Sequence, residues 1–207
     1  MIFLETFNLS YECKGKKILD DIFFACRDGE RIAIKGPSGS GKSCFLSMLC
    51  GLITPSSGQI VCRGKKNTKL KDRAIIGYIP QEDIFLGFDS VISNALLAIE
   101  FNRKSDRKKT EGFVQEMLEF LEIPPEAKPY ELSGGEKRRL SVIRALALRP
   151  MILIADEWSA GLDHPNQVKI GSLFEECSSV IFVSHDPKSI IRCNRVYQME
   201  KGKLKSF

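Results

Sequence analysis

A glycine-rich run near residue 40 has the residue types and the spacing of a phosphate-binding loop. Positions 36–43 read G-P-S-G-S-G-K-S and fit the pattern G-x-x-x-x-G-K-[ST]. Glycines let the backbone curl so that successive N–H groups point at phosphate oxygens, and a following helix adds its positive end. Lys42 would reach the β- and γ-phosphates, and the Ser43 hydroxyl would hold Mg²⁺. The run predicts a nucleoside-triphosphate site formed by Gly36, Pro37, Ser38, Gly39, Ser40, Gly41, Lys42 and Ser43.

Two adjacent carboxylates end an apolar run later in the chain. Residues 151–155 read M-I-L-I-A and are followed by Asp156 and Glu157. A buried strand that carries acids at its carboxyl end places them at the crevice where α/β proteins bind ligands. Asp156 suits the coordination shell of Mg²⁺, and Glu157 suits a general base for an attacking water. The alternative is a polar strand end with a helix-capping acid, which the phosphate loop in the same chain disfavours.

A second helix start also has features of a phosphate site. Residues 132–136 read L-S-G-G-E, in which Ser133 and Glu136 have the spacing of a capping box. Capping alone would explain that spacing. The two glycines, however, leave the backbone bare, so that a phosphate group could approach the helix N-terminus. Because one nucleotide does not need two such ends in one chain, we expect the second to serve the nucleotide of a partner subunit.

The elements that must position these groups alternate along the chain. Strand-like runs cover residues 3–9, 18–25, 31–35, 60–62, 75–79, 151–155, 180–183 and 195–199. Helical patterns cover residues 42–52, 110–121, 134–148 and 166–176. The alternation predicts an α/β fold with a largely parallel sheet covered on both faces. The first two strand runs are separated only by turn residues, which predicts an antiparallel layer at the N-terminal side.

Composition narrows the class of protein further. The chain has 207 residues, of which 43% are hydrophobic, and its net charge is +5. This composition excludes intrinsic disorder, and so mild a charge gives no reason to expect nucleic acid as a partner. Seven cysteines without a C-x-x-C pair indicate a reducing compartment rather than a disulfide frame. The longest uncharged run, 43–62, is interrupted by Gly51 and Pro55 and is too short in its apolar part to span a membrane.

Taken in order, these motifs resemble those of the ATP-binding cassette (ABC) ATPases, the nucleotide-binding subunits of ABC transporters. The resemblance extends over the whole chain. It implies one domain with a P-loop NTPase, RecA-like core, in which helices flank a mixed or parallel sheet, and an N-terminal antiparallel β layer. In this comparison residues 1–81 and 132–207 form the nucleotide-binding core, and residues 82–131 form an inserted α-helical subdomain.

The resemblance also implies roles for individual residues. Tyr11 would stack on adenine, Gln81 would complete the shell of Mg²⁺ and water, and His185 would contact the γ-phosphate. Asp163, in the run S-A-G-L-D at 159–163, is similar to the family's D-loop aspartate. The signature motif, whose residues would contact the ATP of the partner subunit, corresponds to Leu132, Ser133, Gly134, Gly135 and Glu136.

From the same resemblance we expect a head-to-tail dimer of two copies, which binds ATP and Mg²⁺ at its interface. Transmembrane permease subunits would dock on the helical subdomain, so the chain would lie in the cytoplasm, peripherally on the cytoplasmic face of a membrane. ATP hydrolysis would then drive transport. One alternative is a non-transport ABC ATPase, such as an iron–sulfur assembly scaffold or a cell-division subunit. A P-loop kinase or GTPase is disfavoured, because the chain has no N-K-x-D sequence.

Two residues depart from the family pattern. Cys44 follows the phosphate loop where the family usually has Thr, and a thiol is a weaker hydrogen-bond donor to phosphate. Losing one neutral hydrogen bond costs on the order of 1 kcal/mol, so ATP should bind several-fold more weakly. Trp158 follows Glu157 where the family usually has Pro, which adds a backbone N–H and a bulky ring beside the D-loop.

Overall fold

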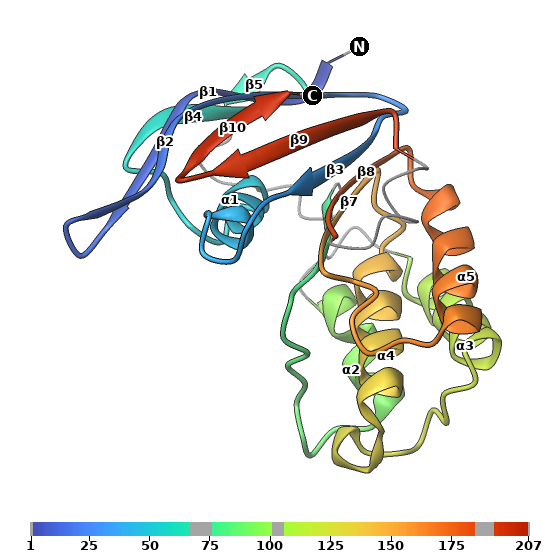
Figure 1. Ribbon diagram of the computed structural model, residues 1–207. Helices are drawn as coiled ribbons and strands as arrows, with labels where there is room; N and C mark the ends of the chain where they lie inside the picture. Colours follow the sequence, from blue (N-terminus) through green and yellow to red (C-terminus); the bar gives the residue numbers. More distant parts are fainter. Residues whose placement is uncertain (1, 67–75, 101–105, 185–192, 207) are drawn as a thin grey trace. The chain divides into compact units, whose positions relative to one another are not determined.

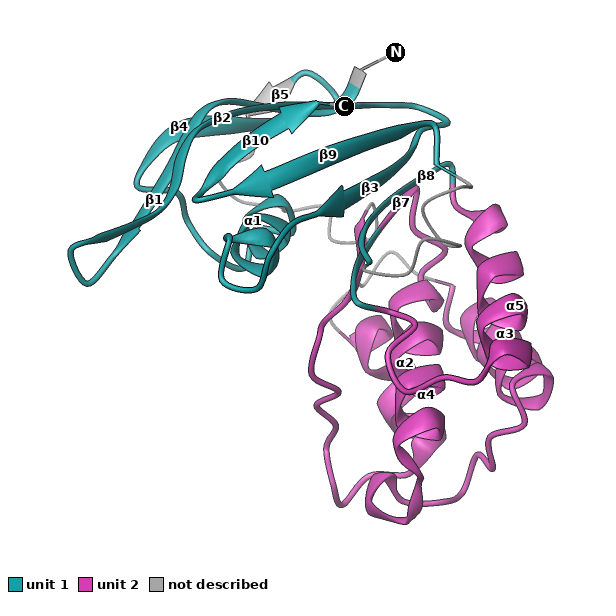
Figure 2. Ribbon diagram, viewed as in Figure 1, with its two compact units in different colours: residues 1–72, 154–157, 178–207 teal, residues 73–153, 158–177 magenta. Residues whose placement is uncertain are grey.

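The computed structural model describes residues 2–66, 76–100, 106–184 and 193–206 (Figure 1). The chain forms two compact units, which Figure 2 distinguishes by colour. The first contains Met1–Asp72, Ile154–Glu157 and Ser178–Phe207. The second contains Arg73–Leu153 and Trp158–Cys177, and so includes the segment expected to be helical together with residues on both sides of it.

An antiparallel sheet of four strands belongs to the first unit and confirms the predicted N-terminal β layer. Its order is β2-β1-β4-β5. Alternating burial along β2, with Leu19, Ile22 and Phe24 buried, matches a sheet with one face on the core. The strands are β1 (Ile2–Cys13), β2 (Lys16–Arg27), β4 (Ser57–Cys62) and β5 (Lys65–Lys66).

A mixed sheet of six strands has the order β10-β9-β3-β8-β7-β6. Its central strand β3 is parallel to both β8 and β9, whereas β10 is antiparallel to β9. Every residue of β7 and β8 is buried, which explains their continuous apolar sequences and confirms the predicted α/β class. The strands are β3 (Arg31–Lys35), β6 (Ile76–Ile79), β7 (Ile152–Asp156), β8 (Ser179–Val183), β9 (Arg195–Glu200) and β10 (Lys203–Ser206).

Helix α1 (Lys42–Leu49) follows the phosphate loop and packs within the first unit. Phe45 of this helix meets Phe24 of β2 edge to face, with ring centroids 5.4 Å apart. The ring of Tyr197, on β9, also packs against Phe24, with ring centroids 5.2 Å apart. The helix ends at Leu49, three residues before the predicted end, because Gly51 adopts a left-handed conformation with φ 72° and terminates it.

The second unit contains four α-helices among its described residues. Three of them begin where the side chain of Asp106, Ser133 or Asp163 accepts a hydrogen bond from the backbone N–H three residues later. The sequence did not predict the first helix as a separate element. The helices are α2 (Val91–Glu100), α3 (Arg107–Phe120), α4 (Gly134–Leu146) and α5 (His164–Leu173).

Two 3₁₀ turns flank these helices, Pro129–Glu131 before α4 and Phe174–Glu176 after α5. The second turn occupies the last part of the helix that the sequence predicts at 166–176. Within the part of the chain that the structure describes, no helix is both long enough and apolar enough to cross a bilayer.

Candidate active site

The predicted phosphate loop connects β3 to α1 and has the curled backbone that its glycines allow. Gly36 has φ 153° and Gly41 has φ 106°. A Cβ atom on Gly36 would collide with the carbonyl oxygen of Met199. A Cβ atom on Gly41 would lie 2.7 Å from Leu19 Cδ2, closer than real Cβ atoms approach other groups. Gly36 is therefore required for space, and the positive φ angles favour glycine at both ends of the loop.

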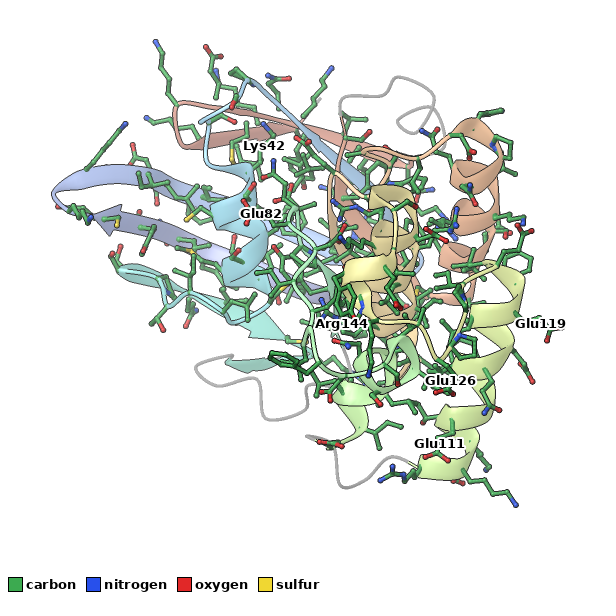
Figure 3. The ribbon with its side chains drawn as sticks, turned by 90° about the horizontal axis from the view of Figure 1, so that it is seen from below. Lys42, Glu82, Glu111, Glu119, Glu126 and Arg144 are labelled. Carbon is green, nitrogen blue, oxygen red and sulfur yellow. The ribbon has the colours of Figure 1, made fainter. Side chains whose placement is uncertain are left out.

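Lys42 lies over this loop, at the first position of α1 (Figure 3). The side chain is largely buried, and its Nζ donates hydrogen bonds to the carbonyl oxygens of Gly36 (2.8 Å) and Pro37 (2.9 Å). The ammonium group is thus held inside the curve of the loop, where phosphate oxygens can become its acceptors. Ser43, the next residue, is exposed, so its hydroxyl is open to a metal ion.

The carboxylates at the end of β7 lie at the same sheet edge as the phosphate loop. Ile34 of β3 is paired with Val183 of β8, and the Glu157 N–H donates to the Val183 carbonyl at 3.1 Å. Ile34, two residues before the loop begins, and Glu157 therefore lie on the two sides of Val183. Neighbouring strands are about 4.8 Å apart, so two spacings, roughly 10 Å, separate the strand that leads into the loop from the strand end at Glu157.

Asp156 and Glu157 differ in environment. Asp156 is 1% exposed at the last position of β7, whereas Glu157 is partly open to solvent. Glu157 also has φ 50°, a left-handed conformation that costs a non-glycine residue about 1–2 kcal/mol. Such strain is found where the surrounding structure imposes a backbone geometry, often at catalytic positions. The sequence contained no signal for this strain.

Tyr11 and Cys44 lie beside the end of the loop in the first unit. Tyr11 is paired with Leu19, the residue next to which Gly41 packs. A hydrogen bond with Cys13 raises the pKa of Tyr11, and a smaller effect comes from Cys44. Burial raises the pKa of Cys44 to about 11, so its thiol is protonated at neutral pH. The predicted adenine-stacking residue is thus near the phosphate loop.

The signature motif begins α4 in the second unit and forms the predicted capping box. The Ser133 N–H donates to Glu136 Oε2 at 2.8 Å, and the Glu136 N–H donates to Ser133 Oγ at 3.3 Å. The Ser133 hydroxyl also contacts this carboxylate, and these bonds lower the pKa of Glu136. A Cβ atom on Gly134 would meet no atom within 4 Å, so there is open space beside this first residue of the helix.

Gln81 is connected to the signature helix through an arginine that the sequence analysis did not identify. Arg138 of α4 donates from Nη1 to the Pro80 carbonyl (2.7 Å) and from Nη2 to the Gln81 carbonyl (2.6 Å). Its Nη1 is also 3.2 Å from Asp83 Oδ1. Arg138 is only 5% exposed. The sequence offered no signal for this role, because Arg138 lies in a run of three basic residues that is typical of an exposed helix face.

Three further residues singled out by the sequence are Asp163, Trp158 and His185. Asp163, in the second unit, caps α5 by accepting the Asn166 N–H at 2.9 Å. Trp158, which departs from the family pattern, is buried and packs against Phe174 with ring centroids 5.0 Å apart. His185 lies outside the described residues.

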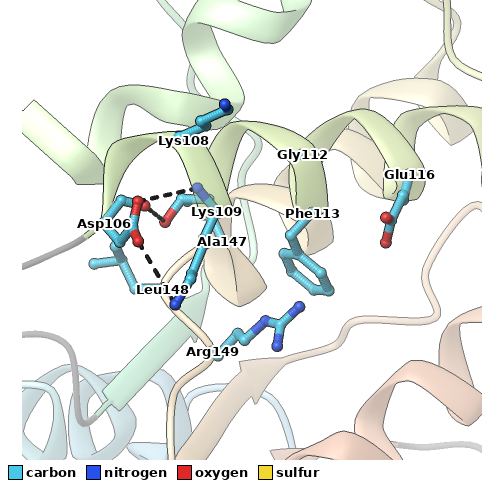
Figure 4. Close-up of a pocket in the computed structure, with 10 residues that line it drawn as sticks. Asp106, Lys108, Lys109, Gly112, Phe113, Glu116, Ala147, Leu148 and Arg149 are labelled. Carbon is cyan, nitrogen blue, oxygen red and sulfur yellow. Dashed lines mark hydrogen bonds and ion pairs between the residues drawn. The ribbon is translucent and has the colours of Figure 1, made fainter.

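A pocket of about 310 Å³ lies between α3 and the end of α4, also in the second unit (Figure 4). The Arg149 guanidinium lies over the Phe113 ring, 4.6 Å from its centroid, and Lys109 is paired with Asp106 at 3.7 Å. None of the residues predicted to bind nucleotide lines this pocket. The lining residues are Asp106, Lys108, Lys109, Thr110, Gly112, Phe113, Glu116, Ala147, Leu148 and Arg149.

Comparison with known proteins identifies the family. Residues 19–160 match the family model described as ABC transporter, a range that includes the phosphate loop, Gln81, the signature motif and both carboxylates. The chain belongs to the ABC transporter ATP-binding family. It is an ABC ATPase, the ATP-binding and ATP-hydrolysing subunit of a transporter, as the resemblance of its motifs implies.

Similar proteins cover nearly the whole chain. The lipoprotein-releasing system ATP-binding protein LolD of Francisella tularensis subsp. holarctica (strain OSU18) is 32% identical over an alignment of 202 residues that covers 90% of this chain and 87% of LolD. The methionine import ATP-binding protein MetN of Carboxydothermus hydrogenoformans is 31% identical, over 99% of this chain and 65% of MetN. A dimeric structure of the ATP-binding cassette MJ0796 with ADP and Pi has a TM-score of 0.87 and 26% identity, covering 99% of this ABC ATPase and 97% of that chain.

Proposed function

We propose that this ABC ATPase hydrolyses MgATP with Glu157 as the general base, Ser43, Gln81 and Asp156 as the metal shell, and the loop at 36–43 as the phosphate cradle. The observation that carries the proposal is that β3, which leads into the loop, and Glu157 lie on either side of Val183. A base and a γ-phosphate must be separated by one water molecule, and two strand spacings, about 10 Å, leave room for both.

The residues present fit a magnesium ion. Asp156 is a buried carboxylate, Ser43 supplies an exposed hydroxyl, and oxygen ligands of this kind are those that Mg²⁺ prefers. When bound, the ion would neutralise charge on the phosphate oxygens. Lys42 would exchange the carbonyl oxygens that it now contacts for phosphate oxygens, and Cys44 would lie near the α-phosphate with a protonated thiol.

A second copy of the chain would complete each site. The open space at Gly134 and the capped N-terminus of α4 support an approach of phosphate to this helix. In a head-to-tail dimer, Leu132, Ser133, Gly134, Gly135 and Glu136 would face the ATP held by the other copy. Asp163 would lie at the same interface, and Tyr11, in its own copy, would stack on adenine.

A transmembrane permease would be the further partner, and the second unit has a suitable surface. Ile84, Leu86 and Phe88 are 70%, 48% and 98% exposed, although all three are apolar. Asn94, which is fully buried, fixes this segment by bonding the N–H and carbonyl of Leu86. Exposed apolar side chains on a segment that is held in place support a protein contact. With a permease as the partner, the chain would work in the cytoplasm, on the cytoplasmic face of a membrane.

The roles can be tested with the purified chain and with membranes. We expect MgATP hydrolysis that is lost in Lys42→Ala and in Glu157→Gln, and that stops when Mg²⁺ is chelated. Phe88→Asp should leave this hydrolysis unchanged but release the chain from polytopic membrane proteins during detergent extraction. A wild-type chain that never co-purifies with membrane proteins would instead support the non-transport alternative.

A further inference from the structure

Three hairpins of the first unit use the same two-residue turn. The turns are Lys14–Gly15, Arg63–Gly64 and Lys201–Gly202, with φ values of 52° and 74°, 49° and 73°, and 49° and 77°. Two positive φ angles are typical of type I′ turns, in which glycine is favoured at the second position. The positive φ at the second turn position therefore explains the presence of glycine in all three turns.

Only one of these glycines touches other elements. A Cβ atom on Gly15 or Gly64 would meet no atom within 4 Å. A Cβ atom on Gly202 would collide with the carbonyl oxygen of Ile18 and lie 3.3 Å from Leu19 Cα. The turn at Gly202 is thus pressed against β2, and its glycine is needed for close approach as well as for conformation.

The backbone of Gly202 joins β2 to the phosphate loop. Its N–H donates to the carbonyl oxygen of Ser40 at 3.1 Å, and its own carbonyl accepts the Asp20 N–H at 2.9 Å. Ser40 lies in the middle of the loop and is 4% exposed. The backbone of Gly202 therefore connects the phosphate loop to β2 through two hydrogen bonds.

The strand that leads into this turn also supports the loop. The Met199 carbonyl oxygen occupies the space beside Gly36, and the Met199 sulfur lies 3.5 Å from the position of a Cβ on Gly41. Met199 is fully buried. The β9–β10 hairpin thus contacts the beginning, the middle and the end of the phosphate loop.

We infer that the turn of the β9–β10 hairpin holds the phosphate loop in its nucleotide-binding shape, with Gly202 as a positioning residue for ATP. This inference rests on the proposed role of residues 36–43. Gly202→Ala would force the turn away from Ile18 and would lengthen or break the bond to Ser40. The loop amides would then lose their common direction toward the phosphate oxygens, while Gly202 itself never touches the nucleotide.

The matched control is Gly64→Ala, which introduces the same side chain at nearly the same φ but in open space. We expect Gly202→Ala to raise the Kd for MgATP about tenfold and Gly64→Ala to change it less than twofold. The thermal midpoint of each variant should be measured without nucleotide and with MgATP. Because ligand stabilisation depends on [L]/Kd, the MgATP-induced shift should shrink in Gly202→Ala only.

A Gly202→Ala variant that melts earlier but keeps the wild-type Kd and the wild-type MgATP shift would overturn the inference. Lys42→Ala separates this result from a failure of the proposed function. If wild type does not bind MgATP, or if Lys42→Ala binds it equally well, the assignment of the loop itself is wrong.

Hydrogen exchange of the wild type provides the measurement if Gly202→Ala does not fold. MgATP should slow exchange in the peptide containing Gly202, whose N–H is bonded to the loop, and should leave the peptide containing Gly64 unchanged. Equal behaviour of the two turns would contradict the inference.

Discussion

Arg138 of the signature helix donates a hydrogen bond of 2.6 Å to the carbonyl oxygen of Gln81. The same guanidinium is 3.2 Å from Asp83, a half-buried carboxylate whose pKa burial raises even though Arg138 opposes the shift. A buried charge is thus used to connect the segment of Gln81 to the helix that begins with the signature motif. In the proposed dimer, Gln81 and the signature motif would serve different ATP molecules, so Arg138 would connect one ATP site to the other.

Replacing Arg138 should lower the stability of the protein and raise the Mg²⁺ concentration that its ATPase activity requires. Arg138→Met leaves Asp83 and two carbonyl groups without their partner, so we expect a loss of about 3 kcal/mol in the free energy of unfolding. The Mg²⁺ concentration for half-maximal ATPase activity should rise, because Gln81 is no longer held. Arg107→Met, which removes only the exposed pair with Glu111, should cost less than about 0.5 kcal/mol. Denaturant titration and Mg²⁺-dependent kinetics measure the two effects, and an unchanged Mg²⁺ dependence would contradict the role of Arg138.

Glu157→Gln should abolish hydrolysis without weakening ATP binding. General-base catalysis typically raises the reaction rate by a factor of about 10² to 10⁴. Glutamine has the same size as glutamate and should adopt the same left-handed backbone conformation, so the site should keep its shape. ATP-bound dimers should therefore accumulate, which size-exclusion chromatography with MgATP would detect. Glu119→Gln, at an exposed position of α3, makes the same chemical change and should have wild-type turnover. Full turnover in Glu157→Gln would exclude this residue as the base.

Ser133→Ala should lose more activity than stability. An N-cap serine contributes about 1 kcal/mol to stability, whereas a donor to transition-state charge contributes about 100-fold in rate. Asp106→Ala is the control, because it removes the equivalent cap of α3, whose Oδ1 accepts the Lys109 N–H at 3.2 Å, away from the signature motif. We expect similar losses of stability in both variants and a loss of ATPase activity in Ser133→Ala alone. Equal turnover in the two variants would show that Ser133 only caps the helix and does not contribute to hydrolysis.

The capping box also predicts a pH dependence. Hydrogen bonds with Ser133 lower the pKa of Glu136 below 4.5 in the folded state. The folded state therefore binds this proton less well, so the stabilisation is fully present above the ordinary pKa and is lost as the pH falls through the folded-state pKa. The difference in unfolding free energy between wild type and Ser133→Ala should accordingly shrink below pH 4.5. A difference that stays constant on acidification would show that the Glu136 charge plays no part.

Cys44→Thr should strengthen ATP binding. A hydroxyl replaces a weak thiol donor, and one neutral hydrogen bond is worth about 1 kcal/mol, or roughly a fivefold change in Kd. Cys44→Ala lacks both groups and should bind ATP no better than wild type. Equilibrium titration with MgATP compares the three proteins at pH 7, where the thiol is protonated because its pKa is about 11. Equal affinities in all three would mean that residue 44 does not contact phosphate.

Several parts of the site could be predicted from sequence because their causes are local. Glycines spaced before Lys42 specify a curled loop, and Ser133 with Glu136 specifies a helix start, since each pattern is satisfied by neighbours in the chain. The apolar run before Asp156 indicated a buried strand for the same reason. The extent of α1 was less predictable, because its end depends on the left-handed conformation of Gly51.

Other features depend on partners distant in the chain. Arg138 is in a run of basic residues that is typical of an exposed helix face, yet it is buried because the Gln81 carbonyl lies opposite. Likewise, Gly202 has the same turn sequence as Gly64, and only the nearby backbone of β2 distinguishes them. Short-range patterns cannot encode such contacts, because what decides them is which segments the sheets bring together.

The sequence by itself determined the phosphate loop, the carboxylate pair, the capped signature helix and the family, because each of these depends on short motifs of neighbouring residues. The tertiary structure alone decided that Val183 lies between the strand leading into the loop and Glu157, that Arg138 bonds the Gln81 carbonyl, and that the β9–β10 hairpin contacts the loop. The physical reason is that hydrogen bonds and close packing between distant segments form only after the strands have paired.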